Sequence, residues 1–166
     1  MFNKELPWIL EIKSKFGLNE VKDNAELKAW LKSDGQTLGD PAVLPWCADA
    51  VQTALKKSLP KETFTGDLAK NPYWARNWLQ FGKAIEPCYG AIAVFGRDGG
   101  GHVGFLVGED TDDWYVLGGN QSNSINITRI VKTRALGFRW PATYTGTTKP
   151  LPKMSADKIP RSTNEF

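Results

Sequence analysis

The chain has 166 residues, a length that suits one domain with a buried core. Its net charge of +3 favours contact with an anionic surface but is too weak to indicate nucleic-acid binding. The single histidine, His102, excludes a three-histidine zinc site and a HExxH metalloprotease helix. The two cysteines, Cys47 and Cys88, cannot form a four-cysteine centre. The remaining possibilities are an enzyme with a Cys/His pair, an enzyme that uses carboxylates, or a protein without enzymatic activity. We expect no metal and no cofactor.

The first half of the chain is typical of helices. A helix opened by a proline is expected over residues 7–16, and a second helix with an Asp/Asn cap over residues 24–32. Glycines and prolines predict a loop over residues 34–45. A third helix is expected over residues 46–58, and a shorter one over residues 73–81.

The second half has short runs of β-branched and aromatic residues separated by Gly, Asp and Asn turns. They predict strands over residues 91–96, 102–109, 113–118, 124–131 and 136–140. Helices followed by neighbouring strands of this kind indicate an α+β fold, with N-terminal helices packed on an antiparallel sheet.

The composition turns to Thr, Lys, Pro and Ser near residue 146. We therefore expect one domain over residues 1–145 and an irregular, poorly packed tail over residues 146–166. The sequence has no run of 18 apolar residues, which predicts no stable membrane insertion. The N-terminal segment lacks the apolar core of a signal peptide, so we expect synthesis in a cytoplasm.

Three residues could form a nucleophilic site. Cys47 stands at the start of the third expected helix, where the helix dipole lowers the pKa of a thiol; the alternative is a small buried core residue. His102 begins a strand after three glycines that could leave space for a substrate, or it is a histidine bonded to a loop. Asn120 lies 18 positions later, where a returning strand could bring its amide beside the imidazole to fix its tautomer. Its alternatives are a turn asparagine and a role for the neighbouring Gln121.

Other residues near these three are candidates for substrate binding. Trp46 and Trp74 could stack on sugar or peptide, or pack in the core. Arg97 could bind a substrate carboxylate, or be a solvated arginine. Gly101 belongs to the glycine run beside His102, and Gln121 is adjacent to the third candidate.

Five segments carry a family resemblance: PWCADAV, NPYWARNWLQFGKAI, GAIAVFGRDGGGHVGFLVGED, VLGGNQSNSINI and GFRWP. They resemble phage-encoded and bacterial cell-wall peptidases close to the CHAP and NlpC/P60 cysteine peptidases, over roughly residues 5–141. The resemblance implies a papain-like core in a single catalytic domain. It places the nucleophile at Cys47, the general base at His102 and the orienting residue at Asn120, and Asp40 stands where the family carries an aspartate.

The sequence departs from this family in some places. Ala91 stands at an acidic position of the family, and the segment before it carries Cys88, which we expect to be structural. Asp40 could organise the cleft or only cap a turn. The backbone N–H of Cys47 can donate to an oxyanion, and the second donor is unassigned.

The function that the resemblance implies is hydrolysis of an amide bond in bacterial peptidoglycan, by an endopeptidase or an N-acetylmuramoyl-L-alanine amidase. We expect a monomeric phage endolysin that accumulates in the host cytoplasm and needs a holin to reach the cell wall. The alternatives are an effector amidase injected into competing bacteria, a non-catalytic wall-binding module of the same fold, and a transglutaminase- or deamidase-type toxin.

Overall fold

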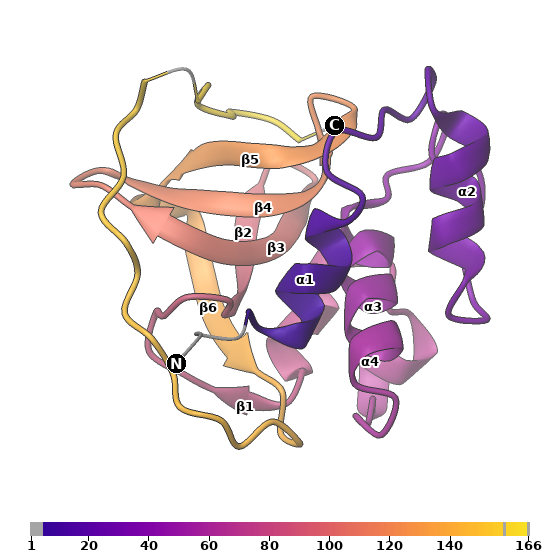
Figure 1. Ribbon diagram of the computed structural model, residues 1–166, viewed down its shortest axis with the longest axis horizontal. Helices are drawn as coiled ribbons and strands as arrows, with labels where there is room; N and C mark the ends of the chain where they lie inside the picture. Colours follow the sequence, from indigo (N-terminus) through magenta and orange to yellow (C-terminus); the bar gives the residue numbers. More distant parts are fainter. Residues whose placement is uncertain (1–4, 158, 166) are drawn as a thin grey trace.

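Helices from the first half of the chain pack against a sheet built from the second half (Figure 1). The computed structural model describes residues 5–157 and 159–165 and confirms the α+β fold. The helical elements are α1 (Pro7–Lys13), α2 (Asn24–Lys32), α3 (Cys47–Ser58), α4 (Gly66–Lys70) and the 3-10 helix η1 (Ala75–Gln80). None of the helices within the described ranges is long and apolar enough to cross a membrane.

The sheet has six antiparallel strands in the order β1-β6-β2-β3-β4-β5. The strands are β1 (Lys83–Ala84), β2 (Ile92–Arg97), β3 (Gly100–Glu109), β4 (Asp113–Gln121), β5 (Ser124–Val131) and β6 (Ala135–Trp140), with the 3-10 turn η2 (Lys132–Arg134) before β6. The β2 and β3 strands form a tight hairpin in which Phe95 pairs with His102. This hairpin brings the only histidine to the middle of the sheet.

Most elements follow the expected boundaries, with several differences; β4, for example, continues to Gln121, beyond its expected end at residue 118. The first helix ends at Lys13, and the expected helix over residues 73–81 is a 3-10 helix that begins at Ala75. The short elements α4 and β1 were not predicted, because five and two residues carry too little periodicity to be recognised.

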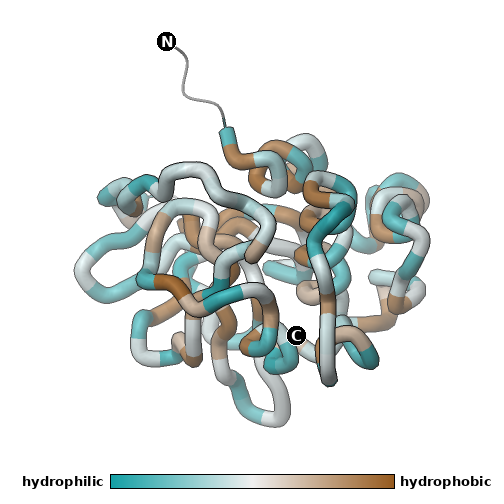
Figure 2. Tube along the Cα trace, turned by 90° about the horizontal axis from the view of Figure 1, so that it is seen from below, coloured by the Kyte–Doolittle hydropathy of each residue, from teal (hydrophilic) through white to brown (hydrophobic). Residues whose placement is uncertain are grey.

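The α3 helix is the centre of the core. It contacts α1, α2, β3 and β4, and every residue from Cys47 to Leu55 is buried. Figure 2 shows the hydrophobic stretches gathered in the interior, with hydrophilic stretches in the outer loops. At the start of α3, the Trp46 ring lies against β4 so closely that a Cβ atom at Gly119 would be 2.5 Å from it. The turn that carries Cys47 is therefore fixed against the end of β4.

The C-terminal tail is irregular, and backbone hydrogen bonds attach it to the sheet. The N–H of Glu109 donates to the Pro152 carbonyl (3.0 Å), and the N–H of Arg129 donates to the Pro160 carbonyl (3.0 Å). Ser162 returns a bond to Arg129 (2.8 Å). Because β5 is an edge strand, its outward N–H and C=O groups need partners, and the tail supplies them. The tail is therefore attached to the sheet through its backbone, while most of its described residues stay exposed.

Candidate functional site

The Cys47 thiol occupies the first turn of α3 and is only 6% exposed. Burial by itself would raise its pKa. The positive charge of His102 opposes this effect, together with the backbone N–H of Val103 and the charge of Arg97, and the pKa falls below its ordinary value of 9.0. The free N–H groups at the start of α3 act in the same direction. The thiol is therefore in surroundings that favour the thiolate.

The imidazole of His102 is completely buried on β3. Its Nε2 lies 2.9 Å from Oε1 of Gln121. Its Nδ1 has no hydrogen-bond partner among residues 5–157 and 159–165, although the Cys47 thiol is near enough for the two charges to interact. Burial would lower the pKa of His102, but Cys47 and then Glu165 outweigh it, and the pKa rises.

The amide of Gln121 determines which nitrogen of His102 carries the proton. Its Nε2 donates to the Asn126 carbonyl (2.8 Å) and to the Val116 carbonyl (3.1 Å). Both acceptors are carbonyl oxygens, so the Gln121 oxygen must face the imidazole and can only accept. His102 therefore carries a hydrogen on Nε2 and directs Nδ1 toward Cys47, as a base for the thiol requires.

Asn120, expected as the orienting residue, does not contact His102. Its Nδ2 donates to the Glu165 carbonyl at 2.9 Å. The β3–β4 pairing of Phe105 with Leu117, continued along the strands, would place residue 120 opposite His102. However, Asn120 has a φ of +56° in an irregular stretch of β4, which turns its side chain away. Gln121, the neighbouring alternative, takes the position beside the imidazole.

Two predicted binding residues support the loop before Cys47. The Trp46 side chain is buried, and its Nε1 donates to Glu20 (3.3 Å), so it packs under the site. Asp40 accepts bonds from Asn24 Nδ2 and from the Ala42 N–H, both at 2.9 Å. These bonds lower the pKa of Asp40, and the bond from Asn24 has the larger effect. Asp40 thus caps the turn that leads to Cys47.

The other predicted binding residues differ in their surroundings. Trp74 is 51% exposed at the start of η1. Gly101 is buried and leaves no open space, since a Cβ atom there would lie 2.9 Å from the Phe95 carbonyl oxygen and 3.0 Å from Cγ of Arg76. Arg97 donates from Nε to the Gly101 carbonyl (3.1 Å) and adds positive charge near Cys47.

Cys88 is a second free thiol with different surroundings. It is 7% exposed, and burial raises its pKa to about 11. No charged group is among the causes of this shift. The two cysteines are therefore equally covered but electrostatically different.

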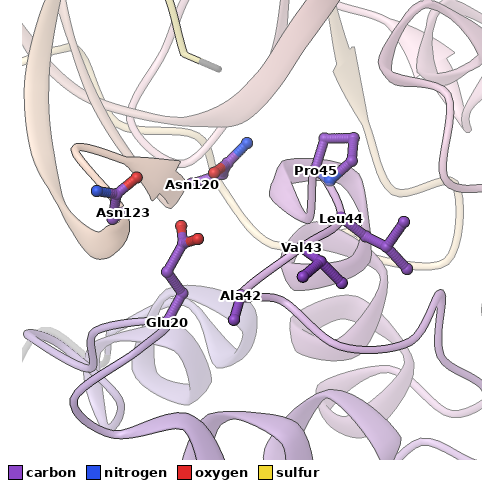
Figure 3. Close-up of a pocket in the computed structure, with 7 residues that line it drawn as sticks. All are labelled: Glu20, Ala42, Val43, Leu44, Pro45, Asn120 and Asn123. Atoms are coloured by element: carbon purple, nitrogen blue, oxygen red, sulfur yellow. The ribbon is translucent and has the colours of Figure 1, made fainter.

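Two hollows are lined by residues close in sequence to Cys47, Gln121 or His102, although none of these three side chains lines either hollow. The first, about 230 Å³, is bounded by Glu20, residues 42–45, Asn120 and Asn123 (Figure 3). The second is larger, about 480 Å³, and is lined by Arg76, Gly96, Arg97, Asp98, Arg134, Thr163 and Asn164. The sequence did not indicate Arg76, Arg134 or the tail residues, because they come from distant parts of the chain.

The described part of the chain has no group of three or more His, Cys, Asp or Glu side chains that could hold a metal ion. A cysteine thiol, an imidazole with one open nitrogen and an orienting amide are the parts needed for nucleophilic attack on a carbonyl. No protein-family model and no curated protein matches this chain.

Proposed function

We propose that the protein is a cysteine peptidase or amidase with a papain-like core that hydrolyses an amide bond of bacterial peptidoglycan. The observation that carries this proposal is the position of the Cys47 thiol, at the start of a buried helix and close enough to His102 for each side chain to shift the pKa of the other. Gln121 holds Nε2 of the His102 ring. These three side chains come from two layers of the fold, Cys47 from a helix and His102 and Gln121 from the sheet.

The reaction begins when Nδ1 of His102 takes the thiol proton and Cys47 Sγ attacks the amide carbonyl carbon. The imidazolium then donates its proton to the leaving nitrogen as the C–N bond breaks, which leaves an acyl-enzyme and a free amine. A water molecule, deprotonated by His102, attacks the thioester, and the carboxylic acid leaves as the thiol is restored. Gln121 accepts from Nε2–H throughout and keeps the ring in one orientation.

The backbone N–H of Cys47 is the donor we assign to the developing oxyanion. It belongs to the first turn of α3, where N–H groups lack partners within the helix. Such a donor aimed at the oxyanion typically contributes a factor of about 10² to 10³ in kcat.

Peptidoglycan is proposed because the segments that carry Cys47 and His102 resemble cell-wall peptidases, and because a net charge of +3 suits an anionic wall. The setting we propose is host lysis by a phage endolysin that depends on a holin, with an interbacterial effector amidase as the second candidate.

A wall-binding module without catalysis is a different class of function. The near-complete burial of Cys47 and His102 is the observation that favours it, because a substrate must reach both groups. The shifted pKa values of the pair argue against it, since a module that only binds does not need a thiolate.

The test is lysis of purified cell walls, followed as loss of turbidity, with mass spectrometry of the released fragments to identify the bond. We expect Cys47→Ser and His102→Ala to lower the rate by at least about 10³-fold. Cys88→Ser is the matched control and keeps the wild-type rate. Lysis by either site variant at the wild-type rate would refute the proposal, and the appearance of new amino termini separates hydrolysis from transglutamination.

A further inference from the structure

The smaller of the two hollows has two unlike walls. One wall consists of residues 42–45, an Ala-Val-Leu-Pro run whose last three residues are exposed. The other wall is polar, and Figure 3 shows its Glu20 carboxylate turned toward Asn120 and Asn123. A ligand that fills this hollow therefore needs an apolar part and a polar group at one end.

The polar wall carries a negative charge without a positive charge beside it. One oxygen of the Glu20 carboxylate accepts a hydrogen bond from Nε1 of Trp46 (3.3 Å), and that donor is uncharged. No lysine, arginine or histidine within residues 5–157 and 159–165 forms an ion pair with Glu20. Glu20 is partly buried, so solvent ions screen its charge less than that of an open surface group. The hollow is therefore suited to a cation.

The two amides add oxygen acceptors to the same wall. Asn120 is 5% exposed, and its Nδ2 donates to the Glu165 carbonyl (2.9 Å), which leaves the side-chain oxygen to accept. In the part of the chain that the structure describes, no group forms a hydrogen bond with the Asn120 oxygen or with the side-chain amide of Asn123. An alkylammonium group has three N–H donors and no acceptor, so it matches a carboxylate flanked by amide oxygens.

Backbone contacts hold the polar wall in place. The N–H of Glu20 donates to the Asn123 carbonyl (2.8 Å), and Asn19 forms an antiparallel bridge with Ser124. The segment between α1 and α2 is thereby attached to the turn between β4 and β5. Acceptors that are already in position bind a ligand at little cost of reorganisation.

The hollow adjoins the proposed catalytic pair through the chain itself. Pro45 lines the hollow and precedes Cys47 by two residues, so their Cα atoms are at most about 7 Å apart. Asn120 also lines it and is bonded to Gln121, whose Oε1 lies 2.9 Å from Nε2 of His102. A substrate side chain in the hollow therefore belongs to a residue close to the amide that Cys47 attacks.

We propose that the smaller hollow is a subsite for a primary amine on a short aliphatic chain, with the ammonium at Glu20 and the chain along residues 42–45. Its volume of about 230 Å³ is below the roughly 300–1,000 Å³ of pockets for drug-sized ligands, so it suits a side chain. The inference rests on the proposed function for its link to the cleaved amide. It names the substrate class: peptides with an amine-bearing aliphatic side chain close to that amide.

The test titrates isotope-labelled protein at pH 7 and low salt with n-butylamine, n-butanol or methylamine. NMR follows the side-chain NH₂ signals of Asn120 and Asn123. Butylamine is protonated at this pH, butanol has the same shape without the charge, and methylamine has the charge without the chain. We expect butylammonium to bind at least about fivefold more tightly than butanol and at least about threefold more tightly than methylammonium.

Glu20→Gln is the informative variant, because it removes the charge and keeps an oxygen that can accept from Trp46. Its preference for butylammonium over butanol should fall below about twofold. Glu26→Gln is the matched control, since Glu26 lies in α2 with a 62% exposed side chain and does not line the hollow. It should keep the preference. Val43→Ser, at an exposed position of the apolar wall, should reduce the advantage of butylammonium over methylammonium.

Equal binding of butylammonium and butanol, or unshifted Asn120 and Asn123 signals at millimolar butylamine, would overturn the subsite. So would an unchanged preference in the folded Glu20→Gln protein, or its loss in Glu26→Gln.

The link to catalysis has its own measurement. In wall lysis, Glu20→Gln should raise KM about fivefold and leave kcat within about twofold, because the ammonium contact is the same in the bound substrate and in the transition state. If the wild-type protein fails to lyse walls while the amine preference persists, the proposed hydrolysis fails and the subsite stands. Lysis by a protein without the amine preference overturns the subsite and leaves the hydrolysis in place.

Discussion

Cys47 and Cys88 form an internal comparison for the electrostatics of the site. Their exposures are 6% and 7%, so access to a small reagent does not distinguish them. Their surroundings distinguish them. Burial would raise the pKa of Cys47, but nearby charges, that of His102 above all, lower it. For Cys88, burial is the only cause, and it raises the pKa to about 11. We predict that iodoacetamide at pH 7 labels Cys47 much faster than Cys88.

The size of the difference follows from the thiolate fractions. A thiol with a pKa of about 11 is ionised to about one part in 10⁴ at pH 7, and one with a pKa below 9.0 to more than about 1%. The ratio of thiolates thus exceeds about 100. The more acidic thiolate is the weaker nucleophile, which removes roughly a factor of ten. A rate ratio above about 10 is therefore expected.

The assay is a time course of labelling, with the two cysteine-containing peptides quantified by mass spectrometry. His102→Gln is the informative variant, because it removes the positive charge and leaves burial to raise the pKa of Cys47. Its Cys47 rate should fall to near that of Cys88. Equal rates in the wild-type protein, or an unchanged Cys47 rate in the folded His102→Gln variant, would refute the role of His102 in lowering the pKa of Cys47 and favour a binding module.

Two further predictions test the orienting amide and a buried charge. Gln121→Ala should lower kcat for wall lysis by about 10- to 100-fold with little change in KM, whereas Asn120→Ala should lower kcat by less than about threefold. A larger loss of kcat in Asn120→Ala than in Gln121→Ala would contradict the geometry. Burial raises the pKa of Asp49 to about 6, so between pH 4 and 6 the folded state holds the extra proton and stability falls as pH rises. Asp49→Asn should therefore increase the free energy of unfolding by about 1–2 kcal/mol at pH 7 and give no gain below pH 4, measured by urea denaturation; equal gains at both pH values would contradict this.

Much of the framework could be predicted because local signals agreed with the final packing. The α3 helix combines a proline-containing loop before it with small and apolar residues, and the structure places its start one residue from the expected boundary. The run HVGFLVGE has the β-branched and aromatic content of a central strand. The positions of Cys47 and His102, at the start of these two elements, followed directly.

The third residue could not be chosen from the sequence, because it depends on one backbone angle. Strand pairing alone would have favoured position 120, and only the left-handed conformation of Asn120 transfers the contact to Gln121. The pairing of Arg134 with Glu165 joins positions 31 residues apart and has no local pattern. The packing of the tail depends on the free edge of β5, which exists only once the strand order is known.

Cys47 and His102 belong to different layers of the molecule, Cys47 to the helices and His102 to the sheet. Only the packing of α3 on β3 and β4 brings them together. In a chain whose layers have separated, the thiol loses the imidazole and regains the weak acidity of an ordinary cysteine. Reactivity is thus conditional on correct folding: an unfolded or partly folded copy carries no activated sulfur, and is protected from the oxidation and cross-linking that a permanently ionised thiol would invite.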